Sequence, residues 1–189
     1  MMSAVVSLDI KNEIFEICRR HGNIYKFFVL ENIPSEKLSN AIKRYASIIS
    51  EDEVIIFLYD YTVFGSANDG FVLTSKRLYF KNIVEKGRVV DIADIRKLSL
   101  EKNASSQYIV VKTPSETLQI RVHQATQPAK NENALFDILD KTIRLLKKPK
   151  TGNIAREKQI PASRPPTCAG CGARNPDSFR RCEYCDSPL

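Results

Sequence analysis

Four cysteines near the end of the chain have the spacing of metal ligands. They form two C-x-x-C pairs separated by ten residues, Cys168 with Cys171 and Cys182 with Cys185. Each C-x-x-C turn presents two thiolates on one side of a tight loop, and two such loops facing each other complete a tetrahedral shell of four sulfurs. The spacing therefore predicts one structural Zn²⁺ held by these four cysteines.

A closed shell of four thiolates indicates a folding role, because no ligand position is left for water or substrate. Residues 168–189 are also too few, and too poor in large apolar side chains, to fold unaided. Disulfides and a redox dithiol are the alternatives. Disulfides need an oxidising compartment, whereas the first residues show no secretory signal and favour a cytoplasmic location. A redox dithiol needs only one pair, in a βαβ context.

The tail resembles the short zinc ribbons found at the ends of many bacterial proteins. The matching residues are Cys168, Cys171, Gly172, Asn175, Pro176, Cys182, Cys185 and Leu189. Asp186 departs from the pattern, because that family usually has glycine there. The spacing is also similar to that of Ran-binding-protein zinc fingers, some of which bind single-stranded RNA or ubiquitin. Those fingers carry a tryptophan just before the first cysteine, where this chain has Pro166.

Residues 147–167 read as a basic linker. They contain six basic residues and one acidic residue, Glu157, and so hold +5 of the formal net charge of +7. Proline and glycine interrupt the basic residues, which favours an extended, solvated tether. The alternative is a weak electrostatic contact with nucleic acid or an anionic membrane surface, whose affinity would fall steeply with salt.

Short apolar segments recur through the middle of the chain at about ten-residue spacing. They predict seven strands in a sandwich or barrel, at 53–61, 70–74, 77–82, 88–92, 95–100, 107–112 and 117–122. None approaches the roughly 20 apolar residues that span a membrane, so we expect no transmembrane segment.

Helical periodicity appears on both sides of these strands. It predicts a helix over 134–146 and two more over 7–20 and 34–49, with 24–30 as a short strand or a buried connector between them. Cys18 falls on the apolar side of the first helix, which is typical of a core residue rather than a nucleophile.

The segment from Gly70 to Lys81, GFVLTSKRLYFK, resembles the v-L-T-x-x-R-l-y-f hairpin of bacterial pleckstrin-homology and GRAM-type domains. Asp94 and Ile95 match the end of the segment that follows in those families, while Asp91 departs from its proline region. The resemblance implies an α+β fold: a seven-stranded pleckstrin-homology-like barrel or sandwich closed by a C-terminal helix. We therefore expect an N-terminal helical extension (1–50), this domain (51–146), the linker (147–167) and the zinc ribbon (168–189).

The sequence gives little sign of catalysis. His21 and His123 have no recognisable nucleophile or base beside them and suit surface or capping positions. Residues 65–70 have the G-x-x-x-x-G spacing of a phosphate loop, but Phe71 and Val72 stand where Lys and Ser or Thr are required. We therefore expect a protein that is not an enzyme.

The resulting hypothesis is a cytoplasmic binding or adaptor protein. Its barrel would recognise a protein segment or an anionic headgroup, and the tethered ribbon would contact a second partner. The candidate residues for an anionic ligand are Lys76, Arg77, Lys81, Lys86 and Arg88. The alternative is a nucleic-acid-associated protein that binds through the ribbon and the basic linker.

Elemental analysis tests the predicted metal site. We expect one zinc per chain, and Cys182→Ser should release the metal and unfold the tail, because metal binding supplies the folding free energy of such a module. The thermal midpoint of the 1–146 region should stay nearly unchanged, since the linker separates the two parts. Loss of both parts together would instead show that the ribbon docks on the domain.

Overall fold

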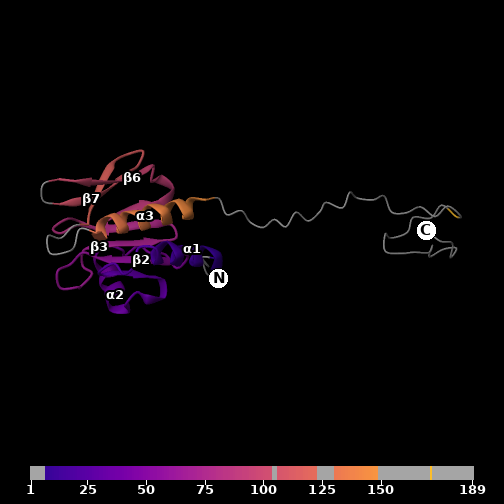
Figure 1. Cartoon of the computed structure of the whole chain (residues 1–189), viewed down its shortest axis with the longest axis horizontal. Helices are drawn as coiled ribbons and strands as arrows, with labels where there is room; N and C mark the ends of the chain where they lie inside the picture. Colours follow the sequence, from indigo (N-terminus) through magenta and orange to yellow (C-terminus); the bar gives the residue numbers. More distant parts are fainter. Residues whose placement is uncertain (1–6, 104–105, 123–129, 149–170, 172–189) are drawn as a thin grey trace. The chain divides into compact units, whose positions relative to one another are not determined.

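The computed structural model describes residues 7–103, 106–122, 130–148 and Cys171 (Figure 1). The chain divides into two units, Met1–Pro149 and Lys150–Leu189. The described helices and strands all belong to the first unit. The predicted ribbon, apart from Cys171, and the predicted linker beyond residue 148 lie outside the described residues. Among the residues described, no helix has the length and apolar content needed to cross a bilayer.

Within the first unit, the described residues form two antiparallel sheets and three helices. The larger sheet has the order β1 (Phe27–Val29), β2 (Ile55–Asp60), β3 (Gly70–Thr74), β4 (Arg77–Lys81), β5 (Arg88–Asp91). The smaller sheet has the order β6 (Lys97–Lys102), β7 (Gln107–Lys112), β8 (Thr117–Arg121). The helices are α1 (Leu8–Arg19), α2 (Ser35–Arg44) and α3 (Lys130–Lys147), and two single 3-10 turns are η1 (Leu30–Asn32) and η2 (Ile92–Asp94). The predicted α+β organisation is thus confirmed.

The central strands β2, β3 and β4 are buried on both faces. On one face Phe57, Phe71 and Phe80 join a core that includes residues of the smaller sheet, α1 and α3. On the other face Leu58, Val72 and Tyr79 pack beneath α2 in a second cluster that includes Ala41 and Tyr45. Figure 1 shows α2 and α3 on opposite sides of β2 and β3. Burying each large apolar side chain stabilises the fold by about 2 kcal/mol. Both faces of the sheet carry such side chains, so each face must be covered for this stabilisation to be gained.

Side-chain hydrogen bonds join the two sheets. The hydroxyl of Tyr59 on β2 donates to the carbonyl of Val122, just after β8, at 3.1 Å. The amide of Asn82, just after β4, donates to the Gln119 carbonyl and accepts from the Arg121 backbone N–H, each at 2.9 Å. These bonds satisfy backbone groups of β8 that would otherwise lose their partners at a corner between sheets.

The seven predicted strands are present as β2 to β8, and β1 lies within the segment predicted as a strand or connector. The predicted helix over 34–49 is wrong at its end, because α2 stops at Arg44. Tyr45 leaves helical geometry with φ −151°, and the backbone N–H groups of Tyr45 and Ala46 both donate to the Ala41 carbonyl. This ending places Tyr45 in the cluster beneath α2, where only 7% of its surface is exposed.

The N-terminal segment packs on the rest of the unit through α1. Ile14 is fully buried in the main core, and Cys18 is half-buried against it. Burial raises the pKa of the Cys18 thiol to about 11, so the thiolate is scarce at neutral pH. The interpretation of Cys18 as a core residue agrees with this placement.

Gly70 begins β3 at φ +137°, and a Cβ at this position would overlap the Tyr59 carbonyl oxygen. Gly70→Ala should therefore lower the free energy of unfolding by about 4 kcal/mol, or prevent folding. Gly22→Ala is the matched control, because Gly22 also has a positive φ of +69° but has nothing within 4 Å of a Cβ. It should cost about 1 kcal/mol. Urea unfolding measures the free energy of unfolding of both variants. Equal losses would show that the Tyr59 carbonyl does not exclude a side chain at position 70.

Candidate functional site

Most of the predicted zinc site lies outside the described residues. Cys168, Cys182 and Cys185 fall there, and Cys171 is described as exposed. The described residues contain no group of three or more His, Cys, Asp or Glu side chains placed to hold a metal ion. Zinc binding by the four cysteines therefore stays a prediction.

The five basic residues considered for an anionic ligand lie at two opposite ends of the larger sheet. Lys76 and Arg77 occupy the turn between β3 and β4 and the start of β4. Lys81, Lys86 and Arg88 lie at the other end, where β4 connects to β5. The fold thus brings them together as a pair and a triplet, and the two groups do not converge on one site.

Four of the five are paired with carboxylates. Lys76 pairs with Asp52 and Lys81 with Asp69. Arg77 Nε lies 3.0 Å from Asp91 Oδ1, and Arg88 Nη1 lies 3.5 Å from Glu116 Oε2. These contacts compensate the positive charges locally, so little of the charge is left to attract an anion.

A buried network holds the β3–β4 end of the sheet. Glu53 accepts hydrogen bonds from the hydroxyls of Thr74, Tyr79 and Ser50, and Arg77 lies 3.4 Å away. Burial by itself would raise the pKa of the Glu53 carboxyl, but the hydrogen bonds from Thr74, Ser50 and Tyr79 outweigh it and hold the pKa below its ordinary value. The carboxylate therefore fixes the chain that follows α2 onto β3 and β4.

Two loops leave the opposite end of the sheet together. Residues 61–69 join β2 to β3, and residues 82–87 join β4 to β5. The register pairs Asp60 with Gly70 and Gly70 with Lys81, so both loops start at the same level, and the Lys81–Asp69 ion pair links them. We call these two loops the loop end.

A buried carboxylate anchors the longer loop. Asp60 has no exposed surface, and it accepts hydrogen bonds from the Thr62 N–H and from Lys37 Nζ, both at 2.9 Å. Lys37, on α2, also donates to the Gly65 carbonyl. The Thr62 hydroxyl accepts from the N–H of Ser66 at 2.8 Å. This network engages the Gly65 carbonyl and the Ser66 N–H, so the start of the 65–70 segment is held as part of the turn between β2 and β3.

Apolar side chains stand exposed at the tips of these loops. Phe64 and Val84 are 97% and 96% exposed, and Val63 and Ile83 beside them are also exposed. Val84 has φ +69°, a region that β-branched residues rarely adopt. Exposed apolar side chains that a rigid frame holds at one end of a domain are typical of a docking surface.

His21 joins two helices rather than serving as a free surface residue. Its Nε2 lies 2.7 Å from Asp137 Oδ2 on α3, and Asp137 also accepts from Lys141. Burial alone would raise the pKa of the Asp137 carboxyl, but the bonds from Lys141 and His21 hold it below its ordinary value. No sequence pattern links residues so far apart. His123 lies outside the described residues.

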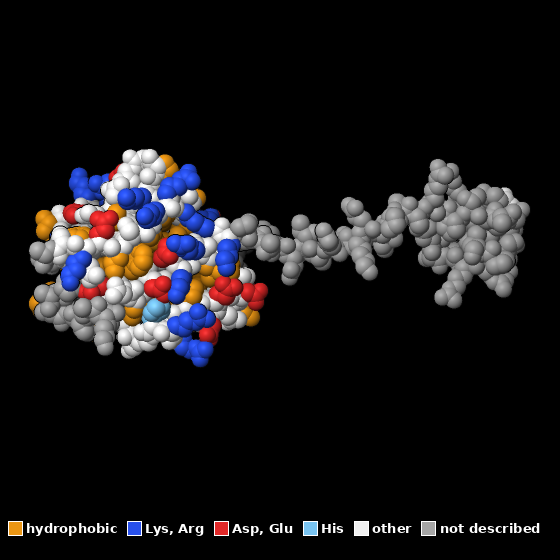
Figure 2. All heavy atoms as spheres, turned by 45° about the horizontal axis from the view of Figure 1, so that its top comes forward, with side chains coloured by type: hydrophobic (Ala, Val, Ile, Leu, Met, Phe, Trp, Pro, Cys, Tyr) orange, Lys and Arg blue, Asp and Glu red, His pale blue; other side chains and the backbone are white. Residues whose placement is uncertain are grey.

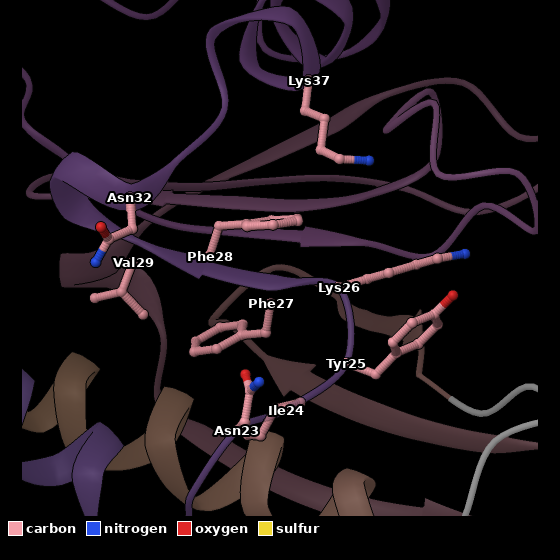
Figure 3. Close-up of a pocket in the computed structure, with 9 residues that line it drawn as sticks. All are labelled: Asn23, Ile24, Tyr25, Lys26, Phe27, Phe28, Val29, Asn32 and Lys37. Atoms are coloured by element: carbon pink, nitrogen blue, oxygen red, sulfur yellow. The ribbon is translucent and has the colours of Figure 1, made fainter.

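A groove of about 610 Å³ runs along β1, the edge strand of the larger sheet (Figure 3). Its lining consists of Asn23, Ile24, Tyr25, Lys26, Phe27, Phe28, Val29, Asn32 and Lys37. Figure 3 shows Phe27 and Phe28 on opposite sides of the strand. Phe27 packs on Phe57 with ring centroids 4.9 Å apart, and Lys37 Nζ lies 5.5 Å from the centroid of the Phe28 ring. No pattern in the sequence predicts a site at this groove.

Comparisons of the chain with models of known families, with curated proteins and with solved structures found no match.

Lys37→Met tests whether Asp60 and its partners hold the longer loop. The substitution keeps the aliphatic stem but leaves the buried Asp60 carboxylate without its cation, which should cost about 2 kcal/mol. Hydrogen exchange of the Ser66 and Ala67 amides should accelerate. Lys43→Met is the matched control, because Lys43 lies exposed on the same helix, and it should leave both measurements unchanged. Equal exchange rates in the two variants would contradict the anchoring role.

Proposed function

We propose that this chain is a non-catalytic binding protein that docks on a partner protein through its loop end. The observation that carries the proposal is the exposure of Phe64 and Val84 in two loops whose bases are neighbours in the sheet. Burying each of these side chains against a partner would contribute about 2 kcal/mol. The network around Asp60 already orders the longer loop, so less conformational entropy is lost on binding.

A protein partner is favoured over an anionic headgroup by the distribution of charge. A headgroup site needs several cations that converge without partners, whereas Lys81 and Arg88 near the loop end have carboxylate partners. Figure 2 shows Lys and Arg side chains interspersed with Asp and Glu over the face in view, rather than gathered in one block. Near the loop end, cations and carboxylates occur together as Lys81 with Asp69 and Arg88 with Glu116, and such a polar surround resembles the rim of a protein interface.

The fold we propose for this unit is a pleckstrin-homology-like domain. Seven strands, β2 to β8, followed by one C-terminal helix, α3, have the element order of that family. The sheets of four and three strands that remain when β1 is set aside support the proposal. Such folds share no active site, which agrees with a binding role.

The tail supplies the second part of the proposed adaptor. Cys168, Cys171, Cys182 and Cys185 would hold one zinc as a structural ion, and the folded ribbon would contact a partner of its own. The support for this part is the ligand spacing in the sequence.

Photo-crosslinking tests the docking role of the loop end. A benzophenone-bearing amino acid at position 64, in the full chain and in the cells that naturally express it, should capture a discrete protein. The same amino acid at position 8 is the control, because Leu8 is an exposed apolar residue on α1. Val84→Ser should lower capture at position 64 by about tenfold while leaving the free energy of unfolding within about 0.5 kcal/mol of the original.

Sedimentation with vesicles of phosphatidylcholine and phosphatidylserine tests the alternative, that the loop end binds a membrane. If the chain sediments with them and Phe64→Ser abolishes sedimentation, the loop end binds membranes and the protein-docking proposal is wrong. It is also wrong if positions 64 and 8 capture the same proteins to the same extent.

A further inference from the structure

The open edge of β1 has backbone groups that none of the described strands covers. β1 is the terminal strand of the larger sheet. The Asp60 N–H donates to the Lys26 carbonyl at 2.9 Å. Lys26 directly precedes β1, and extending the β1–β2 register by one residue places it opposite Asp60. Because hydrogen-bonded pairs alternate along an antiparallel ladder, Phe28 is the next residue whose backbone faces β2. The backbone groups of Phe27 and Val29 therefore face away from the sheet.

The Phe27 N–H turns back to the Ile24 carbonyl at 3.3 Å. This leaves the Phe27 carbonyl and the Val29 N–H as an acceptor and a donor on the open side. Both belong to residues that line the groove of about 610 Å³. An edge acceptor and donor beside a groove are the features that allow an extended segment to add as a further strand.

Positive φ values bracket the strand. Lys26 and Leu30 have φ 56° and 47°, values that non-glycine residues adopt only when the surrounding structure imposes them. The left-handed backbone at each end limits β1 to Phe27–Val29, and η1 follows directly. The edge thus presents one short, fixed pairing site rather than a long strand.

The charge of the groove indicates which residues an incoming segment should carry. Its described lining includes Lys26 and Lys37 and no acidic residue. Lys37 is paired with Asp60, whereas the Lys26 ammonium bonds to the carbonyl oxygens of Thr62 and Val63. Carbonyls stabilise the ammonium without cancelling its charge. A carboxylate on the incoming segment would complement it.

From these observations we infer that the β1 edge binds an extended acidic segment of a partner protein by strand addition. The segment hydrogen-bonds to the Phe27 carbonyl and the Val29 N–H, places an apolar side chain beside Phe28, and sets a carboxylate near Lys26. This site adjoins the loop end through Lys26, whose ammonium bonds to the Thr62 and Val63 carbonyls. Its pairing groups belong to β1, however, so a failure of docking at Phe64 and Val84 would leave strand addition untouched.

Selection of a phage-displayed library of random peptides on the full chain tests the inference. We expect enriched peptides that alternate apolar and β-branched residues and carry Asp or Glu. A synthetic enriched peptide should protect the Val29 amide from hydrogen exchange. Its analogue with a methylated central amide should bind about tenfold more weakly, and Lys26→Gln should weaken binding about threefold. Lys86→Gln removes the same charge at the loop end and should change nothing.

Several results would overturn the inference. The inference is wrong if the selection enriches no peptide. It is also wrong if the methylated analogue binds as tightly as the parent peptide, or if the peptide binds without slowing hydrogen exchange of the Val29 amide. Protection of the Val29 amide in the free chain would show that the chain itself, or a second copy, already covers the edge. Equal losses for Lys26→Gln and Lys86→Gln would show that net charge, and not the groove, governs binding.

Discussion

The burial of β2, β3 and β4 on both faces is the constraint on which the other elements depend. An antiparallel sheet with one wet face needs a single covering layer, whereas Leu58, Val72 and Tyr79 make the second face of this sheet apolar as well. The smaller sheet and α3 cover one side, and α2 covers the other. Helix α2, which belongs to the predicted N-terminal extension, is therefore part of the folded core, because without it these strands would expose large apolar side chains.

Much of this architecture could be predicted from local pattern. The apolar run before Asp60 marks a buried strand, and the alternation of Leu118 and Ile120 with polar residues marks a strand with one wet face. The end of α2 could not be predicted, because Tyr45 continues the helical periodicity. Its departure reflects packing over Gly87, where a Cβ would lie 2.7 Å from that of Tyr45, and such a contact leaves no trace in local spacing.

The candidate surfaces were harder to predict than the fold. Charge counting pointed to Lys81 and Arg88, but their carboxylate partners, Asp69 and Glu116, are distant in sequence and meet them only after the strands pair. In the sequence, Phe64 and Val84 cannot be told from apolar residues of the core, and only their exposure in the structure distinguishes them. The groove depends on strand order, since β1 is an edge because, among the described strands, it pairs with β2 alone. The contact between His21 and Asp137 could not be predicted for the same reason, because the two residues are far apart in sequence.

The shortness of β1 also bears on kinetics and on solubility. A long, flat edge recruits copies of the same chain and leads to aggregation, whereas three residues between left-handed positions allow only a few ladder bonds. Each such bond contributes about 1 kcal/mol net. A segment added there would therefore dissociate quickly, and segments that compete for the edge would exchange rather than stay bound for long.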